Sequence, residues 1–367
     1  MSKYISQNIQ NNLDDKKETA NTIDINKGLQ MIDIIPDRLS LYLNMIGGHS
    51  FFVVYSKKYL IKSVGEKELK FYEFIKSNNI DSRHLPTFFG LIEKNVKQYE
   101  YIINYKKKCD IFFKNMVKFF NIKLEDIDIE NELVFHKKFN DFISDKNTNN
   151  NEILDKSFAL LKEELIAIKN NCPKKLYWIF YWYIKWQKEF ISDRYIIIEN
   201  LEFHIKFPSV IDIKIGNEKK ISKETGKVKI FKGAYESLGC RIMGISSNNK
   251  YFKSRYETKE LIEKEFIKEL VNFFANKKNI LISVINELKE IIKFIQNFSL
   301  KIYFCSLLIF YDISENDNEV IVKLIDFNLT NNAKESKICP IKSEANEGFI
   351  NCMNNLISIL ININKNN

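Results

Sequence analysis

Two charged residues lie two positions apart in the mostly apolar segment Pro208–Gly216. The segment predicts a β-strand, and alternate side chains of a strand share one face. Asp212 and Lys214 would therefore project together, with Val210 as their apolar neighbour. A carboxylate and an ammonium group are costly to bury without a partner or a purpose. The pair indicates either a cross-strand salt bridge or a functional site.

A second carboxylate, Asp326, stands at the end of the apolar run Val320–Leu324 and Ile325. Such a residue is well placed to hold the Mg²⁺ of a nucleotide, because Mg²⁺ takes one or two carboxylates together with phosphate oxygens. The alternative is a turn or capping residue. Lys62 ends an earlier predicted strand, and Glu68 lies on the helix that follows. This arrangement is typical of protein kinases, where a strand lysine contacts phosphates and pairs with a helix glutamate.

The residues Glu199-Asn200-Leu201 follow another predicted strand and have the position of a hinge. Along the chain, the order is strand lysine, helix glutamate, hinge, Asp-x-Lys strand and late Asp, which is the order of a kinase. The sequence has no G-x-G-x-x-G loop, no H-R-D motif and no Walker A motif. We therefore expect a kinase-like site outside the protein kinases.

The elements that would position these residues are strands in the first part of the chain. Ser50–Tyr55 and Tyr59–Lys62 predict a hairpin, and Glu66–Lys76 predicts a helix. Residues 94–190 are predicted to be mostly helical and to include an Asn-rich loop at 144–151. Within them, Trp178, Trp182 and Trp186 recur every four residues and share a helix face. A membrane or ligand surface is the alternative, but we expect this face to pack in the core.

The second half is predicted to contain strands and long amphipathic helices. The predicted strands are Tyr195–Ile198, Ser209–Ile215, Ile302–Tyr311 and Glu319–Phe327, and the predicted helices are Glu257–Ala275, Ile280–Phe298 and Phe349–Ile363. We expect an α+β protein of two lobes with a mixed sheet in the second half. The predicted divisions are a disordered arm over 1–28, a first lobe over 29–198 with a helical insertion at about 94–190, and a second lobe over 199–367 that carries the site.

Composition excludes several classes of protein. Apolar residues make up 45% of the 367, while Gly and Pro are scarce, so collagen-like or broadly disordered protein is excluded. The net charge of +9 favours an anionic partner without naming it. The six cysteines form no C-x-x-C pair, which argues against structural zinc and for buried cysteines in a reducing compartment. With no secretory signal and no apolar run of about 20 residues, we expect an intracellular, cytoplasmic protein, with the nucleus left open as an alternative location.

Segments in a fixed order resemble the motifs of the inositol polyphosphate kinase family. Pro208–Gly216 resembles the P-x-x-x-D-x-K-x-G signature of that family, and the resemblance extends over roughly residues 44–93 and 195–360. The other matching segments are Gly47-Gly48-His49, Glu68–Glu73, Leu85–Gly90, Ser237–Gly244, Ser306–Asp312, Ile325-Asp326-Phe327 and Glu347-Gly348 with Leu356. Residues 94–190 look like an insertion specific to this chain.

The resemblance implies a two-lobed, kinase-like fold and a role for each matching residue. Lys62 would contact the phosphates of ATP with Glu68 positioning it, and Asp326 would hold Mg²⁺. Asp212 would orient the ribose or the accepting group, and Lys214 would lie between the γ-phosphate and the inositol. The remaining roles are adenine binding through the backbone of Glu199 and Leu201, and an open role near the phosphates for Ser306.

An inositol polyphosphate needs further cations, since each phosphate carries negative charge. Candidate clamps follow the signature and the next motif; for any single lysine the alternative is a solvated loop. They are Lys219, Lys220, Lys223, Lys227, Lys229, Lys232, Lys250, Lys253 and Arg255. The expected partners are ATP, Mg²⁺ and an inositol polyphosphate, with no nucleic acid and no transmembrane segment, in a monomeric protein.

Within the family, Glu199–Leu201 and Phe203–Pro208 look most like the inositol hexakisphosphate kinases, which make diphosphoinositols. The multikinases, which act on lower inositol phosphates, share the D-x-K-I-G that Ile215 completes. One departure bears on inositol recognition: Leu329 stands where relatives carry a histidine. It leaves open a catalytically weak relative that binds ATP or inositol phosphates as a sensor.

Overall fold

The computed structural model describes residues 39–44, 46, 52–94, 97–119, 159–189, 193–216, 220–221, 228–229, 232–247, 250–297, 302, 305–314, 319–327 and 346–366. These residues form two lobes, each built around a five-stranded sheet, which confirms the predicted α+β class. Among the described residues, all strand pairings in both sheets are antiparallel, so the expectation of a mixed sheet in the second half was wrong. The predicted arm over 1–28 and the Asn-rich loop lie outside the described residues.

The sheet of the first lobe has the strand order β1-β2-β3-β5-β4. Its strands are β1 (Ser40–Leu41), β2 (Phe52–Ser56), β3 (Tyr59–Ser63), β4 (Phe88–Glu93) and β5 (Arg194–Glu199). The predicted hairpin is confirmed, since Val53 of β2 pairs with Ile61 of β3. Strand β5 lies between β3 and β4 and is buried on both faces, which explains its unbroken run of large apolar residues.

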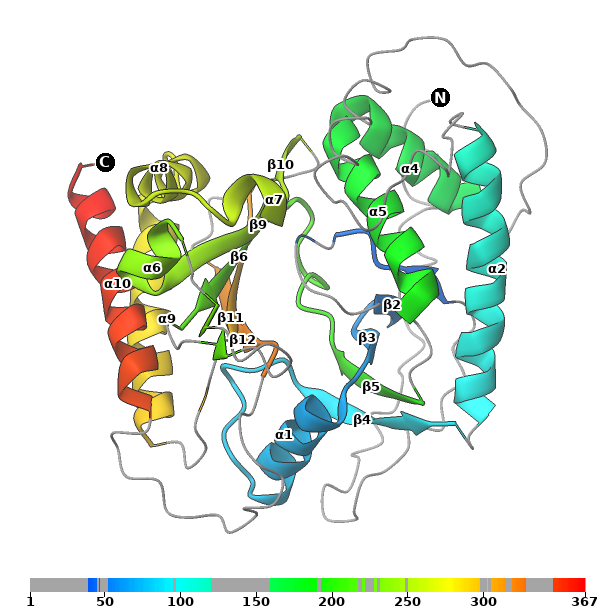
Figure 1. The fold of residues 1–367 in the computed structure, drawn as a ribbon, viewed down its shortest axis with the longest axis horizontal. Coiled ribbons are helices and arrows are strands. Elements are labelled where there is room, and N and C mark those ends of the chain that lie inside the picture. The colour runs from blue at the N-terminus through cyan, green and yellow to red at the C-terminus, as the bar shows by residue number, and fades with distance from the viewer. Residues whose placement is uncertain are drawn as a thin grey trace, which may run out of the picture.

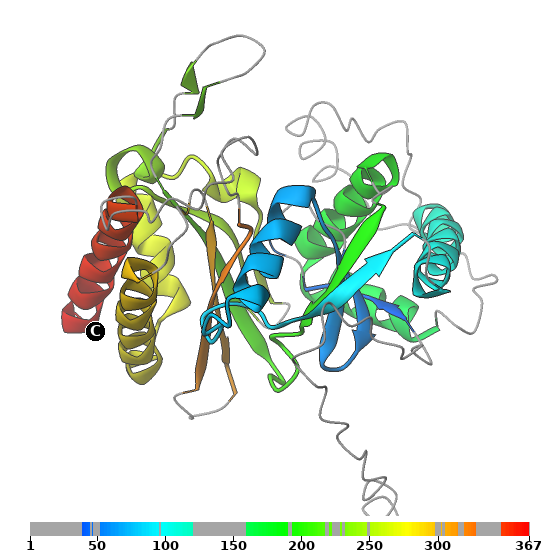
Figure 2. The same cartoon turned by 90° about the horizontal axis from the view of Figure 1, so that it is seen from below.

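Helices cover this sheet on both sides. They are α1 (Glu66–Ser77), α2 (Lys97–Phe119), α4 (Ala159–Asn171) and α5 (Pro173–Glu189). Figure 1 shows α2 at the outer edge of the lobe and α5 nearer the second lobe, where it contacts β10, while Figure 2 shows α1 between the two sheets. Trp178 and Trp182 of α5 are each 1% exposed, which confirms core packing for this helix face; the side chain of Trp186 lies outside the described residues.

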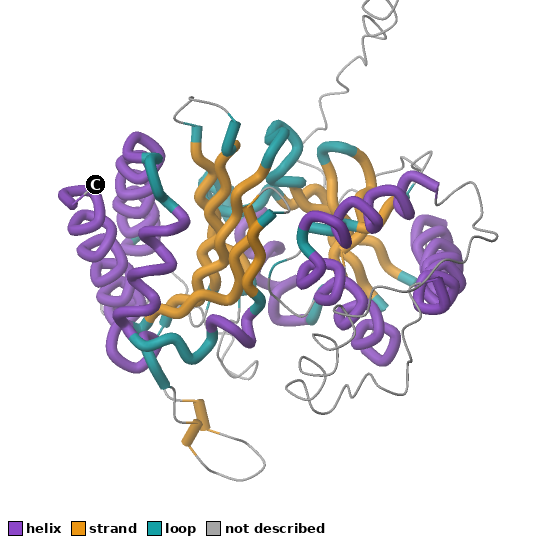
Figure 3. Tube along the Cα trace, turned by 90° about the horizontal axis from the view of Figure 1, so that it is seen from above, coloured by secondary structure: helices purple, strands orange, loops and turns teal. Residues whose placement is uncertain are grey.

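The sheet of the second lobe has the strand order β10-β9-β6-β11-β12. Its strands are β6 (Pro208–Ile215), β9 (Cys240–Ser247), β10 (Tyr251–Lys253), β11 (Ser306–Asp312) and β12 (Val320–Ile325), and a small separate sheet pairs β7 (Lys220–Ile221) with β8 (Val228–Lys229). The helices are α6 (Ala234–Leu238), α7 (Arg255–Thr258), α8 (Glu263–Phe273), α9 (Lys278–Gln296) and α10 (Glu347–Asn366). Figure 3 shows helices covering one face of this sheet, while its other face is turned towards the first lobe. Within the described part of the chain, no helix combines the length and apolar character needed to cross a bilayer.

The long helix predicted over Glu257–Ala275 is two helices, α7 and α8. Ser254 begins α7 with a capping box that Glu257 completes. The chain then leaves the helix, and the Leu261 carbonyl accepts a hydrogen bond of 2.8 Å from the Ala234 amide at the start of α6. This tertiary contact interrupts a segment whose apolar periodicity alone predicts one continuous helix.

Strand β6 has two different faces. Ile211, Ile213 and Ile215 are buried in the core that α8, α9 and α10 cover. Because alternate side chains point to opposite faces, Asp212 and Lys214 project towards the first lobe.

The described cysteines are all buried, and none of them forms a disulfide with another described residue, as expected of core cysteines. They are Cys109, Cys172, Cys240, Cys305 and Cys352.

Gly244 of β9 lies opposite Asp212 and leaves room for the first lobe to approach the second. A Cβ at this position would lie 2.0 Å from the Ile46 carbonyl oxygen, a clash with backbone that no rotamer change relieves. We expect Gly244→Ala to cost more than about 1 kcal/mol of unfolding free energy, measured by thermal or denaturant unfolding. Gly65→Ala is the matched control, because nothing lies within 4 Å of its Cβ position. Equal stability of both variants would show that the close approach at Ile46 does not constrain the fold.

Candidate active site

Lys62 lies at the centre of a buried charge cluster between the lobes. Its side chain is buried on β3, and its Nζ lies 2.6 Å from Glu68 Oε1 of α1 and 3.0 Å from Asp326 Oδ1. Burial alone would lower the pKa of Lys62, but the charges of Glu68 and Asp326 raise it above its ordinary value. The lysine is therefore a permanent cation. The structure brings together three residues that were predicted from distant parts of the sequence.

Asp326 follows β12 in the left-handed backbone region, with φ of 59°. Asp and Asn tolerate this region better than other side chains except glycine. Phe327 fixes the turn, because its ring stacks on Phe71 of α1 with centroids 3.8 Å apart and packs edge-on against Tyr72. The Asp-Phe pair and the Phe-Tyr pair of α1 thus hold the carboxylate beside Lys62.

Asp212 is a buried carboxylate with an unused oxygen. Its side chain is on β6 and only 3% exposed. Burial, and then the negative charge of Asp326, raise the pKa of Asp212 to about 7. The Ser306 hydroxyl of β11 hydrogen bonds to the carboxylate, yet Asp212 Oδ1 has no hydrogen-bond partner among the described residues. A buried acceptor left open in this way fits a ligand hydroxyl or a ligand-bound cation.

A largely apolar pocket connects this cluster to the hinge. Its floor and roof come from both lobes, and Lys62, Asp212 and Asp326 are at one end. The apolar lining is Ile46, Phe52, Leu60, Pro86, Ile198, Leu201, Val210, Leu308, Phe310 and Ile325, with Tyr42, Asn44, Tyr72 and Glu199 completing the wall. An apolar slot with carboxylates and a lysine at one end fits a flat base with a charged tail.

In the hinge Glu199–Leu201, the Glu199 side chain is hydrogen bonded, while the Leu201 backbone amide is available to a ligand. Glu199 Oε2 accepts hydrogen bonds of 3.1 Å from both the amide and the hydroxyl of Thr87. Its own amide donates to the Thr87 carbonyl, at 2.9 Å. The amide of Leu201 has no hydrogen-bond partner among the described residues. A ligand edge could therefore pair with the hinge backbone at Leu201, as the sequence predicted.

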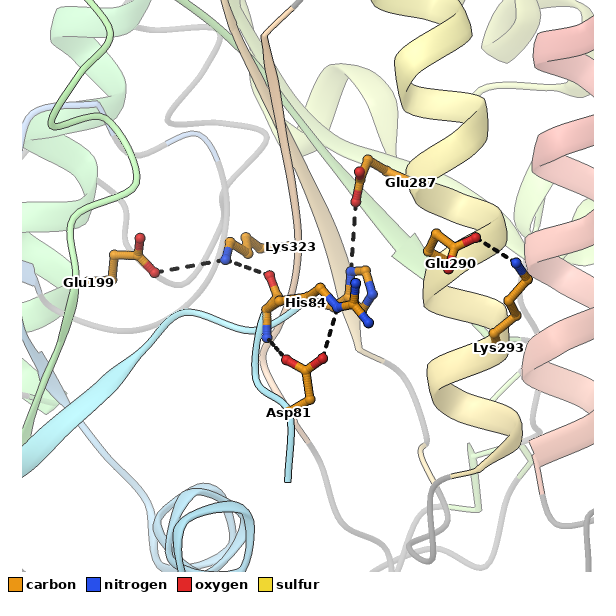
Figure 4. A network of polar contacts seen from close by, with 8 residues as sticks. Asp81, His84, Glu199, Glu287, Glu290, Lys293 and Lys323 are labelled. Atoms are coloured by element: carbon orange, nitrogen blue, oxygen red, sulfur yellow. Dashed lines mark hydrogen bonds and ion pairs between the residues drawn. The ribbon is translucent and has the colours of Figure 1, made fainter. Parts of the chain in front are cut away.

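A polar bridge joins the lobes beside the hinge (Figure 4). Lys323 of β12 donates to the Arg83 carbonyl at 2.6 Å and lies 3.9 Å from Glu199 Oε2. The next residue, Leu324, donates its amide to the His84 carbonyl at 2.8 Å. The strand that carries Asp326 is thereby tied to the loop before β4, so the position of Asp326 relative to the hinge is fixed by the backbone.

Lys214 has a second cation directly opposite it. Arg241 of β9 pairs in register with Lys214, next to an irregularity between Asp212 and Ile213. The Arg241 guanidinium lies over the Tyr235 ring at 4.7 Å, and its Nε has no hydrogen-bond partner among the described residues. Like charges directly opposite each other destabilise a sheet, and within the described chain neither cation forms an ion pair. The positive charge of Arg255 also contributes to lowering the pKa of Arg241. Lys214 and Arg241 therefore form a cationic site that a bound anion would stabilise.

Arg241 was not among the site residues predicted from the sequence. It stands in the matching segment Ser237–Gly244, but only the strand pairing with β6 shows that it faces Lys214. Of the predicted clamps, Arg255 lies near this pair, whereas Lys253 makes a 2.6 Å ion pair with Glu269 of α8 and Lys250 is exposed in the β9–β10 turn.

Among the remaining predicted clamps, Lys220 and Lys229 have no described side chain. Lys220 and Lys229 lie on β7 and β8, while Lys232 is exposed before α6. The predictions that fall outside the described residues are Lys219, Lys223, Lys227 and Leu329.

The residues present fit a metal carried by a nucleotide. Within the described chain, no group of three or more His, Cys, Asp or Glu side chains could hold an ion by itself. Mg²⁺ usually keeps waters and takes one or two carboxylates plus substrate phosphates. Asp326, with the open oxygen of Asp212 nearby, supplies such a partial ligand set.

Comparison with known proteins finds a family model that matches less than half of the chain, mostly its second lobe. Residues 195–361 match the family model described as inositol polyphosphate kinase. This confirms the family resemblance over that range, while the resemblance to hexakisphosphate kinases stays a prediction. A search of curated proteins found no match.

Two solved structures are similar to the chain. One is an inositol phosphate multikinase from S. cerevisiae in complex with ADP and Mn²⁺, with 17% identity over 47% of this chain and 84% of that chain and a TM-score of 0.37. The other is a second structure of an inositol phosphate multikinase, with 20% identity over 46% of this chain and 85% of that chain and a TM-score of 0.36.

Proposed function

We propose that this protein is an ATP-dependent inositol polyphosphate kinase. The observation that carries the proposal is the pair of opposed cations, Lys214 and Arg241, next to Asp212 on the paired strands β6 and β9. Asp212 in turn lines the nucleotide pocket together with Asp326. One side of the site therefore suits a nucleotide with a cation, and the adjacent side suits an anionic acceptor. The match of residues 195–361 to the inositol polyphosphate kinase family supports the same acceptor.

Each residue of the site would have a separate role in phosphoryl transfer. The hinge backbone at Leu201 would bind the base, and Lys62, held by Glu68, would contact the nucleotide phosphates. Asp326 would hold Mg²⁺, which neutralises charge on the transferred group when bound. Asp212 would accept a hydrogen bond from the ribose or from the attacking hydroxyl. Lys214 would contact the transferred phosphate and the acceptor together, which is the positioning and charge neutralisation that this reaction needs.

Inositol hexakisphosphate is the acceptor we propose, on the basis of the Glu199–Leu201 and Phe203–Pro208 segments. The test incubates the protein with Mg-ATP and this acceptor and looks for a more anionic product that contains a diphosphate. A parallel reaction with inositol trisphosphate decides between subtypes. Much faster turnover of the trisphosphate would overturn the hexakisphosphate assignment and favour a multikinase.

The same experiment tests the enzyme against a sensor. A sensor would bind both ligands, seen as ligand-induced thermal stabilisation, and would form no product from either acceptor. That outcome would overturn the proposed activity. It would also make Leu329, in place of the family histidine, the first position to restore by substitution.

Arg241→Met is expected to raise the KM for the inositol phosphate by about tenfold or more, because a half-buried charge-assisted contact to phosphate is lost. The KM for ATP should change little, since Arg241 is not among the residues that line the nucleotide pocket. Steady-state kinetics with each substrate varied in turn measure both values. Lys264→Met, an exposed cation on α8, is the control and should leave both constants unchanged. An unchanged acceptor KM in Arg241→Met would remove Arg241 from the acceptor site.

A further inference from the structure

The segment over residues 39–46 separates the nucleotide pocket from the helical insertion. Tyr42, Asn44 and Ile46 line the pocket. The alternate residues Leu41 and Leu43 are buried in the core that includes Trp178 and Ile179 of α5. One wall of the pocket therefore rests directly on a helix that the family resemblance leaves unexplained.

A buried polar relay runs from α5 through this wall to the hinge. Lys175 is 1% exposed, and its Nζ donates to Asn44 Oδ1 at 2.7 Å. The Asn44 side-chain amide in turn donates to Glu202 Oε2 at 2.7 Å. Glu202 immediately follows Leu201, and its backbone amide donates to the Asn200 side chain at 3.2 Å. The relay thus joins α5, the pocket wall and the turn after the hinge.

Such a relay lowers the stability of the fold, because burying a charge costs more free energy than burying an apolar side chain of similar size. Glu202 is half-buried, and its Oε1 atom is buried with no hydrogen-bond partner among the described residues. The Tyr42 hydroxyl is the other pocket-wall group that interacts with this carboxylate. The cluster around the relay consists of aromatic and aliphatic residues. A polar relay in this place therefore points to a role in fixing the geometry of the pocket.

We propose that Lys175 is a positioning residue for the nucleotide site, acting through Asn44 of the pocket wall and Glu202 of the turn after the hinge. The helical insertion is then part of the nucleotide-binding apparatus and not an independent appendage. This inference rests on the proposed function, because it assumes that the pocket binds ATP.

Because the charge of Lys175 depends on pH, the pH dependence of ATP affinity tests the proposal independently of substitutions. Burial lowers the pKa of Lys175 to about 8, against the opposing charges of Glu202, Cys172 and Glu164. The pKa values of Tyr42, Glu202, Glu164 and Cys172 are all raised by burial. Lysine is charged below its pKa, so the relay is complete at pH 7 and loses its cation as the pH rises above about 8. Affinity for ATP should fall over the same interval.

The test compares Lys175→Met with Lys174→Met by isothermal titration with a non-hydrolysable ATP analogue and, separately, with inositol hexakisphosphate. Lys174 is the matched control because it is the adjacent residue, is exposed, and pairs with Glu257 at 2.8 Å outside the relay. We expect Lys175→Met to weaken nucleotide binding by about tenfold, the loss of one buried charged hydrogen bond. Affinity for the inositol phosphate should stay within about twofold, and Lys174→Met should bind both ligands like the wild type.

The Lys175→Arg variant separates positioning from simple destabilisation. It should keep wild-type affinity for the analogue at pH 7 and hold that affinity at pH 9, where the wild type weakens, because arginine remains charged. Equal analogue affinity in wild type and Lys175→Met would overturn the inference while leaving the kinase proposal intact. Failure of the wild type to bind the analogue would instead overturn the proposed function. If Lys175→Met does not fold, the pH profiles decide, and identical profiles of wild type and Lys175→Arg would overturn the inference.

Discussion

Asp326→Asn is expected to lower kcat by about 10³-fold without unfolding the protein, since removal of the charge that holds a catalytic metal costs several kcal/mol of transition-state stabilisation. Asparagine is the substitution that isolates the charge. It tolerates the left-handed backbone at φ of 59° and keeps an oxygen that can accept from Lys62. Single-turnover kinetics at several Mg²⁺ concentrations measure the loss and show whether the metal requirement rises.

The controls for this variant separate charge from backbone strain. Asp326→Ala removes the charge and also places an unsuited residue in the left-handed region, so it should unfold at a lower temperature than Asp326→Asn. Asp81→Asn removes an exposed carboxylate whose one ion pair among the described residues is with Arg83, and it should keep full activity. If Asp326→Asn keeps wild-type kcat and metal dependence, the metal ligand lies elsewhere and the assignment of Asp326 is wrong.

The elements that local pattern specifies were predictable. The β2–β3 hairpin, α1, β5, β6 and α10 follow from alternation or from helical periodicity in single segments. The break between α7 and α8 was not predictable, because the hydrogen bond from Ala234 to Leu261 joins distant segments. The same limit explains the mixed sheet that was expected: strand direction depends on pairing between strands far apart in sequence, which no local pattern records.

The site was predictable where its residues carry a motif. Lys62, Glu68 and Asp326 were expected and do meet. Arg241 and Lys175 could not be found in the same way, since their roles come from what lies opposite them: Lys214 across a strand pair, and Asn44 across a helix–strand contact. Among many lysines and arginines, only burial and contact distinguish these two from solvated charges.

Asp212→Asn is expected to abolish most activity and at the same time stabilise the protein. The pKa of Asp212 is raised to about 7 in the folded state, first by burial and then by Asp326, while an unfolded aspartate titrates near ~4. The folded protein therefore binds this proton more tightly than the unfolded chain does. The stability contributed by the protonated group is fully present below ~4 and is lost as the pH rises to about 7. Asparagine cannot ionise, so the variant does not lose this stability as the pH rises.

The measurement is the unfolding temperature of both proteins without metal or nucleotide, at pH 5 and pH 8. Asp212→Asn should unfold at a higher temperature by about 2–4 °C or more, and the difference should be larger at pH 8, where the wild-type carboxylate is ionised. Glu290→Gln is a suitable control, because this exposed carboxylate forms its one ion pair within the described part of the chain with Lys293 on the same helix. A lower unfolding temperature for Asp212→Asn would mean that the carboxylate is paired and stabilising. A gain in stability with a loss of activity would show instead that Asp212 is kept, at a cost to the fold, for the ligand that completes the hydrogen bonding of Oδ1.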